Sequence, residues 1–273
     1  MTVTYDIHGT GDAGAPTVLL SSGLGGAAAY WRAQIAGLVE AGYRVLAYDQ
    51  RGTGRSAGAL PADYAIAHMA ADVIEILDDS HTARCHVVGH ALGGLVGLQL
   101  ALDAPARVAS LALVNAWARL SPHTARCFAA RLALLHAAGA RAYVEAQPLF
   151  LYPAAWSAAN AALVQDEVDH AFAHFPGTET MLARIGALKA FDVHARLGEI
   201  AVPVWVSAAR DDLLVPWTSS QELSLGLARA TLELAPTGAH AHNVTSPAAF
   251  NRGLLAFLAG AASLAPTTTE HAA

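Results

Sequence analysis

The sequence is poor in cysteine, in lysine and in long apolar runs. Its two cysteines, Cys85 and Cys127, are too few for a disulfide framework or a zinc site, and they indicate a reducing compartment. Lys189 is the single lysine among 16 basic residues, no basic cluster occurs, and the net charge is −6. Nucleic acid is therefore not expected as a partner. No uncharged apolar stretch reaches the length of about 18 residues that a membrane span needs, so a membrane partner is not expected either.

The amino end lacks the basic and apolar segments of a signal peptide, which predicts a cytoplasmic protein. The chain is rich in apolar residues. Of its 273 residues, 54% are hydrophobic and 14% are charged, which excludes a disordered chain. Alanine supplies close to half of that apolar fraction, so an exposed apolar stripe cannot be told from core. Assembly into a homo-oligomer is therefore left open.

Short apolar runs alternate with helical patterns along most of the chain. This alternation indicates right-handed crossovers and a mainly parallel sheet with helices on both faces, which is an α/β fold. The expected strands are 3–7, 17–21, 43–48, 86–88, 111–114, 202–207 and 232–234, and the expected helices are 30–40, 66–77, 92–103, 219–228 and 248–258.

The alternation stops between residues 119 and 196, where only helical patterns occur. A helical block between two strands of one sheet is an insertion, and its natural place is a cap over the carboxyl ends of the strands. We therefore expect a core of residues 1–118 and 197–265, a helical cap of 119–196, and a flexible polar tail of 266–273. The helices expected inside the cap are 124–136, 141–145, 154–174 and 180–189.

The segment Gly89-His-Ala-Leu-Gly93 stands at a predicted strand-to-helix junction. This is the place and spacing of the nucleophile elbow, Gly-x-Ser-x-Gly, in which a sharp turn lifts the middle side chain into an active site. Here the middle residue is Ala91, and a methyl group cannot attack a carbonyl. An acyl-enzyme at this position is therefore excluded. The alternative interpretation is an ordinary glycine-rich turn between a strand and a helix.

Backbone amides for an oxyanion are expected from two loops. The glycine-rich segment 21–26 follows a predicted strand and precedes a helix, and in hydrolases with an elbow such a loop supplies one N–H group while the residue after the nucleophile supplies the other. The matching donors are the amides of Leu24 and Leu92. The turn 49–56 contains Asp49 and Arg51, to which we assign a structural role rather than a chemical one.

Asp212 and His240 follow two successive predicted strands, after the elbow. The order nucleophile, acid, histidine is typical of the elbow-bearing hydrolases. A carboxylate on one imidazole nitrogen fixes the tautomer and leaves the other nitrogen free to exchange a proton. Asp211 is expected to cap a helix or to be solvated. His242 forms a His-x-His pair with His240, but no third ligand has convincing spacing, so no metal is expected.

The whole chain apart from its tail resembles the α/β-hydrolase superfamily, and within it the RutD family. The resemblance is carried in the core by Tyr48-Asp-Gln-Arg-Gly-Thr-Gly54, Val88-Gly-His-Ala-Leu-Gly93, Asp211-Asp-Leu-Leu-Val-Pro216 and Asn243-Val-Thr245, and in the cap by His123-Thr-Ala-Arg-Cys-Phe128 and Val144-Glu-Ala-Gln-Pro-Leu-Phe-Leu-Tyr-Pro153. The cap segments are the most specific, because caps diverge first. That family is similar in having alanine at the elbow, which indicates that Ala91 is native. The second histidine of Gly238-Ala-His-Ala-His242 is not a family feature.

The resemblance implies an α/β-hydrolase fold with an inserted helical cap and a role in pyrimidine degradation. The implied substrate is a small anion: 3-aminoacrylate, converted to malonic semialdehyde and ammonia, or carbamate, converted to ammonia and CO2. Both reactions cleave a C–N bond without a covalent nucleophile or a cofactor. We expect His240 and Asp212 to exchange protons, the Leu24 and Leu92 amides to hold an oxygen, and Trp117 and Arg119 to contact the substrate carboxylate.

Two other functions are left open. One is a serine esterase or lactonase whose nucleophile has been replaced by Ala91, and the other is a non-catalytic relative that binds a small ligand. A burst with activated esters after Ala91→Ser favours the first. Tight ligand binding without acceleration of aminoacrylate decay favours the second.

Overall fold

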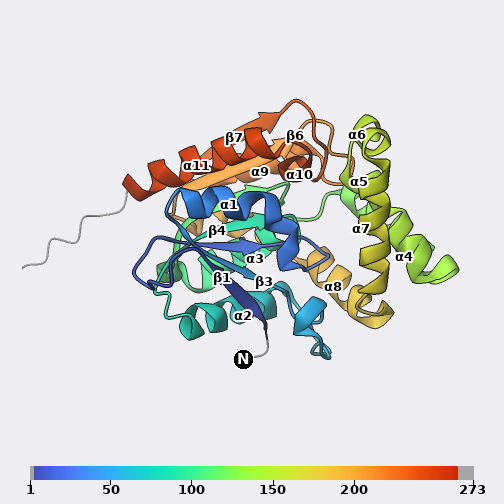
Figure 1. Cartoon of the computed structure of the whole chain (residues 1–273), viewed down its shortest axis with the longest axis horizontal. Coiled ribbons are helices and arrows are strands. Elements are labelled where there is room, and N and C mark those ends of the chain that lie inside the picture. Colours follow the sequence, from blue (N-terminus) through green and yellow to red (C-terminus); the bar gives the residue numbers. More distant parts are fainter. Residues whose placement is uncertain (1–2, 264–273) are drawn as a thin grey trace, which may run out of the picture.

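A central sheet organises the part of the chain that the computed structural model describes, residues 3–263 (Figure 1). The strand order is β1-β3-β2-β4-β5-β6-β7, with β1 antiparallel to β3 and every other neighbouring pair parallel. The predicted α/β class with a mainly parallel sheet is thus confirmed. The strands are β1 (Tyr5–His8), β2 (Thr17–Ser21), β3 (Arg44–Tyr48), β4 (Cys85–His90), β5 (Val108–Val114), β6 (Val204–Ala209) and β7 (Ala230–Ala235).

Helices cover both faces of the sheet, as burial of the middle strands requires. One face of β2 carries Leu19 into the core cluster that also contains Val73 and Leu95, and the other carries Val18 into a cluster with Leu254. The core helices are α1 (Arg32–Glu40), α2 (Ile66–Asp79), α3 (Leu92–Asp103), α9 (Trp217–Gly226), α10 (His242–Thr245) and α11 (Pro247–Ser263). Short 3-10 helices are η1 (Ala28–Trp31), η2 (Gly54–Ser56), η3 (Pro105–Arg107) and η4 (His194–Glu199).

The ends of several predicted strands differ from the structure. The expected strand 86–88 extends from Cys85 to His90, because the ladder with β5 continues as far as the pair His90 and Val114. Likewise the expected strand 111–114 begins at Val108. Tertiary pairing therefore lengthens strands whose apolar core alone is visible in the sequence. None of the described helices combines the length and apolarity that a membrane span requires.

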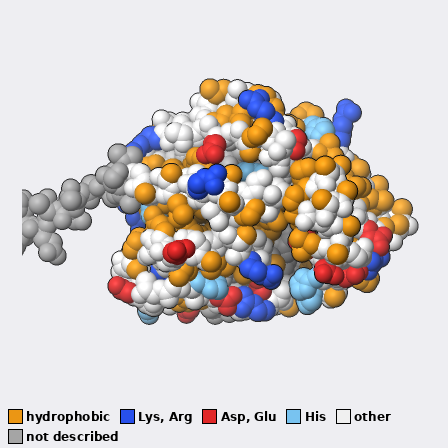
Figure 2. All heavy atoms as spheres, turned by 45° about the horizontal axis from the view of Figure 1, so that its top comes forward, with side chains coloured by type: hydrophobic (Ala, Val, Ile, Leu, Met, Phe, Trp, Pro, Cys, Tyr) orange, Lys and Arg blue, Asp and Glu red, His pale blue; other side chains and the backbone are white. Residues whose placement is uncertain are grey.

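Between β5 and β6 the described chain is helical. The helices are α4 (Pro122–Glu145), α5 (Gln147–Leu151), α6 (Ala154–Ala159), α7 (Ala161–Ala173) and α8 (Thr178–Ala190). They stand together beside the sheet in Figure 1, and Figure 2 shows many apolar side chains on the surface of the molecule there. Leu149 and Phe172 are among the exposed large apolar side chains of these helices. The boundaries of this cap at 119 and 196 stay a prediction. The expected tail, 266–273, lies outside the described residues.

The helices expected at 124–136 and 141–145 correspond to two helical segments of α4, which meet at a kink at Gly139. The backbone φ there is 81°, which is not helical and which glycine adopts readily. The expected helix 154–174 is broken at Asn160 into α6 and α7. The side-chain amide of Asn160 donates to the carbonyl of Trp156 at 2.8 Å, so it ends α6 locally.

The turn from β4 into α3 packs directly on the end of β2. A Cβ atom built on Gly93 would lie 2.0 Å from the carbonyl oxygen of Ser21, and one built on Gly89 would lie 2.3 Å from the carbonyl oxygen of Gly93. Both obstacles are backbone atoms, which cannot move aside as a flexible side chain can. The two glycines therefore fix the distance between the helix and the sheet.

We expect Gly93→Ala to lower the free energy of unfolding by about 3 kcal/mol, since a methyl group is forced against backbone. The matched control is Gly186→Ala on the exposed face of α8, where a Cβ meets nothing within 4 Å. That change should raise stability by about 0.5–1 kcal/mol through helix propensity. Chemical denaturation of both variants measures the difference. Equal stability of the two would contradict the close packing.

His86 lies buried in β4, with its Nδ1 2.8 Å from the Oγ of Ser110 in β5. Burial lowers the pKa of His86 to about 4. In the unfolded chain the imidazole titrates near 6.5, so the unfolded state binds more protons at intermediate pH. The contribution of neutral His86 to the free energy of unfolding is therefore complete above about pH 6.5, and it is lost as the pH falls toward 4.

Between these pH values the free energy of unfolding should therefore fall with decreasing pH. We expect His86→Gln to reduce that slope by about 1.4 kcal/mol per pH unit. Denaturant unfolding at several pH values between 4 and 7 measures the slope in both proteins. Parallel curves would show that His86 does not carry this pH dependence.

Candidate active site

His240 and Asp212 meet at the carboxyl edge of the sheet. Asp212 follows β6, and His240 follows the neighbouring strand β7. The Nδ1 atom of His240 lies 2.8 Å from Oδ2 of Asp212, and the two side chains are 3% and 0% exposed. The structure thus brings together the two residues that the sequence pairs. Because the carboxylate accepts from Nδ1, the other ring nitrogen, Nε2, is left as the acceptor in the neutral imidazole.

Three further donors hold the Asp212 carboxylate. Its Oδ1 accepts from the amides of Leu214 at 2.8 Å and Val215 at 2.9 Å, and its Oδ2 accepts from the side-chain amide of Asn115 at 2.6 Å. Asn115 directly follows β5 and has a backbone φ of 50°. These bonds use both oxygens and fix the orientation of the carboxylate. Asn115 was not singled out in the sequence, where its only signal is its place at a strand end.

Asp211 holds the loop that carries His240. Its carboxylate accepts from the amide of Ala239 at 2.9 Å and from that of Gly238 at 3.2 Å. Ala239 has a backbone φ of 54°, a conformation that costs energy for a residue with a Cβ atom. Asp211, which was expected to cap a helix or to be solvated, instead holds this turn. Two consecutive aspartates thus position His240, one through the amides of the two residues before it and the other through its ring.

Ala91 occupies a strained turn at the end of β4. Its backbone φ is 48° and its ψ is −113°, and its amide donates to the carbonyl of Val114 at 2.8 Å. An ordinary turn does not require a strained alanine, whereas the elbow does. The geometry thus favours the elbow over a simple glycine-rich turn. Leu92 begins α3 directly after it, where helical amides have no acceptor in their own helix.

The loop with Leu24 packs against this turn. A Cβ atom built on Gly23 would lie 2.9 Å from the ring of His90, so only glycine fits. The carbonyl of Leu24 points to the guanidinium of Arg184, which donates to it from Nη2 at 3.1 Å. The loop with Leu24 is thereby held beside the elbow, and the role of its amide in holding an oxyanion stays a prediction.

His90 connects the elbow to His240. Its Nε2 lies 2.8 Å from the carbonyl oxygen of His240, and the two ring centroids are 4.7 Å apart. Burial lowers the pKa of His90 well below the usual range of histidine, so the ring is neutral. Because a carbonyl only accepts, Nε2 carries the proton and donates it. His242 instead lies with its Nε2 2.9 Å from the Oγ of Ser207, and burial lowers its pKa to about 4.

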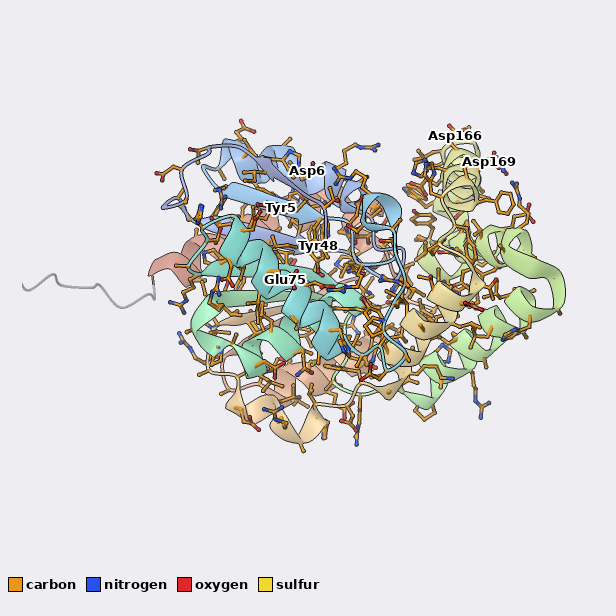
Figure 3. All side chains as sticks on the ribbon, turned by 90° about the horizontal axis from the view of Figure 1, so that it is seen from below. Tyr5, Asp6, Tyr48, Glu75, Asp166 and Asp169 are labelled. Atoms are coloured by element: carbon orange, nitrogen blue, oxygen red, sulfur yellow. The ribbon has the colours of Figure 1, made fainter. Side chains whose placement is uncertain are left out.

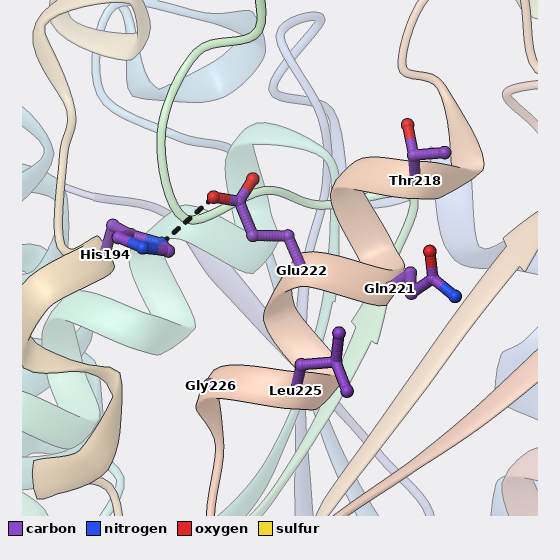
Figure 4. Close-up of a pocket in the computed structure, with 6 residues that line it drawn as sticks. All are labelled: His194, Thr218, Gln221, Glu222, Leu225 and Gly226. Carbon is purple, nitrogen blue, oxygen red and sulfur yellow. Dashed lines mark ion pairs between the residues drawn. The ribbon is translucent and has the colours of Figure 1, made fainter.

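Arg119 is not brought to this site, contrary to expectation. Its guanidinium is 53% exposed and forms an ion pair with Glu222 of α9 at 2.7 Å. Glu222 also meets His194 at 3.1 Å and lines a surface hollow of about 390 Å³ (Figure 4). The arginine that we expected to bind substrate is therefore paired with the carboxylate of Glu222 on α9. Trp117 is buried, and its indole nitrogen has no hydrogen-bond partner in the described structure.

Arg184 is a buried residue that the sequence analysis missed. It extends from α8 of the cap and is fully buried. Besides Leu24, its guanidinium donates to the carbonyl of Arg51 at 3.2 Å and to Oε1 of Gln50. In a sequence an arginine on a helix is taken as solvent-exposed. The available signal was its spacing, because it shares a helix face with Met181, Ile185 and Leu188, all buried.

Asp49 and Arg51 are both used to shape the turn after β3, as assigned. The carboxylate of Asp49 accepts from the amides of Ala28 at 2.8 Å and Arg55 at 3.0 Å. Arg51 forms an ion pair with Asp72 of α2. Neither side chain is left for chemistry.

Comparison with known proteins agrees with this geometry. The family model for the alpha/beta hydrolase fold matches residues 16–247. A relative from Variovorax paradoxus is 67% identical over 259 residues, covering 95% of this chain and 97% of its own. Another from Pseudomonas syringae is 51% identical, covering 93% of this chain and 98% of its own. Both are named RutD, with a provisional assignment as carbamate hydrolases.

Solved structures are also similar to this chain. A hydrolase from Pseudomonas aeruginosa has a TM-score of 0.84 at 30% identity, with 94% of each chain covered. The enol-lactonase from Burkholderia xenovorans has a TM-score of 0.85 at 27% identity, with 94% of this chain and 96% of its own covered. The family model spans most of the chain, and the relatives named RutD are 67% and 51% identical to it over more than nine-tenths of its length. This chain therefore belongs to the RutD family of α/β-hydrolase fold proteins.

Proposed function

We propose that this protein is a cytoplasmic hydrolase that cleaves a C–N bond of a small anion in pyrimidine degradation. The substrate is 3-aminoacrylate, which gives malonic semialdehyde and ammonia, or carbamate, which gives ammonia and CO2. The observation that carries the proposal is a buried His240–Asp212 pair, 2.8 Å apart, next to an elbow that holds alanine. The site retains an acid–base pair and lacks a nucleophile.

An enamine can be hydrolysed by proton transfer alone. Protonation of the carbon next to the carboxylate turns the enamine of 3-aminoacrylate into an iminium ion. Water then adds to the carbon that bears nitrogen, and ammonia leaves as the aldehyde forms. The sum is one aminoacrylate and one water giving one malonic semialdehyde and one ammonia. Each step needs a group that gives or takes a proton, and none needs a covalent bond to the enzyme.

The residues divide this work between them. Nε2 of His240 exchanges protons with the substrate carbon and with the attacking water, while Asp212 supports the positive charge of the imidazolium. The amides of Leu24 and Leu92 hold a carboxylate or carbonyl oxygen. The methyl group of Ala91 takes less room than a serine side chain that would otherwise point to the substrate, and so leaves space for the water. Trp117 lines the site.

We expect His240→Ala to remove the acceleration over the spontaneous reaction. General acid–base catalysis contributes about 10²–10⁴-fold, so the loss should be of that size. The measurement is time-resolved ammonia release from 3-aminoacrylate generated in situ, with and without enzyme. The matched control is His81→Asn, an exposed histidine on the loop before β4, at the opposite edge of the sheet, which should keep the full rate. Equal ammonia release by wild type and His240→Ala would refute the mechanism and favour a ligand-binding protein.

The variant Ala91→Ser separates this mechanism from that of a serine esterase. With the histidine pair and both amides in place, a serine at the elbow should give a burst of about one equivalent of product with an activated ester such as p-nitrophenyl acetate. The wild type should give no burst. Ammonia release from 3-aminoacrylate should not rise, because the reaction uses water. A large rise in Ala91→Ser would show that the native chemistry is that of a serine hydrolase.

A further inference from the structure

Two arginines inside the cap are buried without a carboxylate partner. Arg131 of α4 is 4% exposed and Arg184 of α8 is 0% exposed. None of the ion pairs formed among residues 3–263 includes either of them. A guanidinium that is removed from water without an opposite charge costs several kcal/mol in free energy, about the penalty for any unpaired buried ion. Two such groups in one small cap require an explanation.

The acids of the cap do not neutralise these arginines. Asp166 and Asp169 project from the outer side of α7 in Figure 3, and Asp169 pairs with Arg141 at the surface. Glu167 accepts a hydrogen bond from the hydroxyl of Tyr152 at 2.7 Å. On the core side, Asp72 is paired with Arg51. Within residues 3–263, no ion pair therefore supplies Arg131 or Arg184 with a counter-charge.

Arg184 is satisfied by neutral oxygens alone. Its donors contact the carbonyls of Leu24 and Arg51 and the side-chain oxygen of Gln50. These bonds hold the Leu24 loop and the turn after β3 against the cap. Burial lowers the pKa of Arg184, but a guanidinium stays protonated at any physiological pH. Its full charge thus contacts the carbonyl of Leu24, the residue whose amide we propose as an oxygen-binding donor.

Arg131 has most of its donors unused. Its guanidinium carbon lies 5.0 to 5.7 Å from the ring centroids of Phe128, Tyr143 and Phe150, which is within the range of cation–π contact. Nη2 donates to the hydroxyl of Tyr143 at 2.8 Å, its single hydrogen bond within the described chain. Nε is buried with no partner. The rings stabilise the cation without using the fork of N–H groups that binds carboxylates.

The neighbours of Arg131 contact the segments that carry Asp212 and His240. Cys127, one helical turn before it, contacts the carbonyl of Leu213, the residue after Asp212, at 3.6 Å. Phe150 of its aromatic cage precedes Leu151, whose carbonyl accepts from the amide of Ala241, the residue after His240, at 3.0 Å. Arg131 is thus flanked by the two segments that carry Asp212 and His240.

Tyr143 connects the two arginines. Its hydroxyl accepts from Arg131, and the charges of Arg131 and Arg184 both act to lower its pKa, although burial outweighs them and raises it. Both arginines therefore act on the same tyrosine and belong to one positively charged region of the cap.

We propose that Arg131 and Arg184 form the anion subsite of this active site. Arg131 donates its free N–H groups to the carboxylate of the substrate, and Arg184 adds positive charge while positioning the Leu24 loop. The subsite selects a small monoanion over its neutral isostere, because only the anion compensates the buried charge. The identity of the anion rests on the proposed function, whereas the subsite itself can be tested with an unreactive ligand.

The test compares propionate with propionamide, which have three carbons like 3-aminoacrylate and do not react. Wild type should bind propionate at least about tenfold more tightly than propionamide, as titration calorimetry or ligand NMR measures. Arg131→Met should abolish that preference. Methionine suits an aromatic cage, and replacing an unpaired buried charge by an apolar chain is not expected to unfold the protein. Arg131→Lys, which keeps the charge without the fork, should retain part of the preference.

Arg184→Lys is chosen because loss of the whole side chain would leave Leu24 and Gln50 without donors. It should weaken propionate binding severalfold and lower the preference over propionamide, a ratio that a purely structural change does not move. The matched control is Arg44→Met. Arg44 is 2% exposed and donates only to neutral oxygens of Ser80 and Thr82, but it begins β3 at the amino edge of the sheet. Its replacement should leave the ratio unchanged.

The outcomes separate the subsite from the proposed reaction. No preference for propionate in the wild type, or the same preference in Arg131→Met, overturns the subsite even if 3-aminoacrylate is hydrolysed. A preference that is lost in Arg131→Met but not in Arg44→Met supports the subsite. If the wild type then fails to release ammonia from 3-aminoacrylate or carbamate, the proposed function is wrong and the anion subsite stands.

Discussion

The close approach of three backbone segments at the carboxyl edge of the sheet is the constraint on which the site depends. Gly93 at the start of α3 comes so near to the end of β2 that no side chain fits between them. That contact forces β4 to turn at Ala91 in a strained conformation, and it brings the Leu24 loop against His90. His90 in turn holds the carbonyl of His240. The packing of the helix on the sheet is thus connected to His240 through two contacts, that of the Leu24 loop with His90 and that of His90 with the carbonyl of His240.

The strain at Ala91 is informative because it serves no nucleophile. A backbone in a sparsely populated region costs about 1–3 kcal/mol and persists only where its surroundings impose it. In a serine hydrolase the same strained turn presents the nucleophilic hydroxyl to the substrate. Here the turn is still followed directly by the first residue of α3, Leu92, and His240 still has its Asp212 partner. The same architecture can therefore support proton transfer to a substrate that water attacks directly, a reaction for which position matters more than nucleophilicity.

The sequence predicts the central part of this structure well, because there the chemistry depends on chain order. Strand ends carry Asp212 and His240, parallel strands align those ends, and the 2.8 Å contact follows from the topology. It predicts less well what depends on tertiary partners. Asn115 becomes a donor to Asp212 only because β5 and β6 are neighbours. The break at Asn160 is set by a local side-chain hydrogen bond rather than by apolar periodicity.

The arginines show the same limit and its physical reason. Arg119 follows a strand end and so has the expected position, yet Glu222 on the outer helix α9 neutralises it at the surface. Arg131 and Arg184 stand in helices, and none of the ion pairs among residues 3–263 includes either of them. An arginine already paired with an internal acid gains little from a ligand, whereas a buried unpaired one gains most of its lost solvation from an anion. Which arginines are left unpaired is decided by the distribution of the acids, a property of the folded chain that residue spacing does not contain.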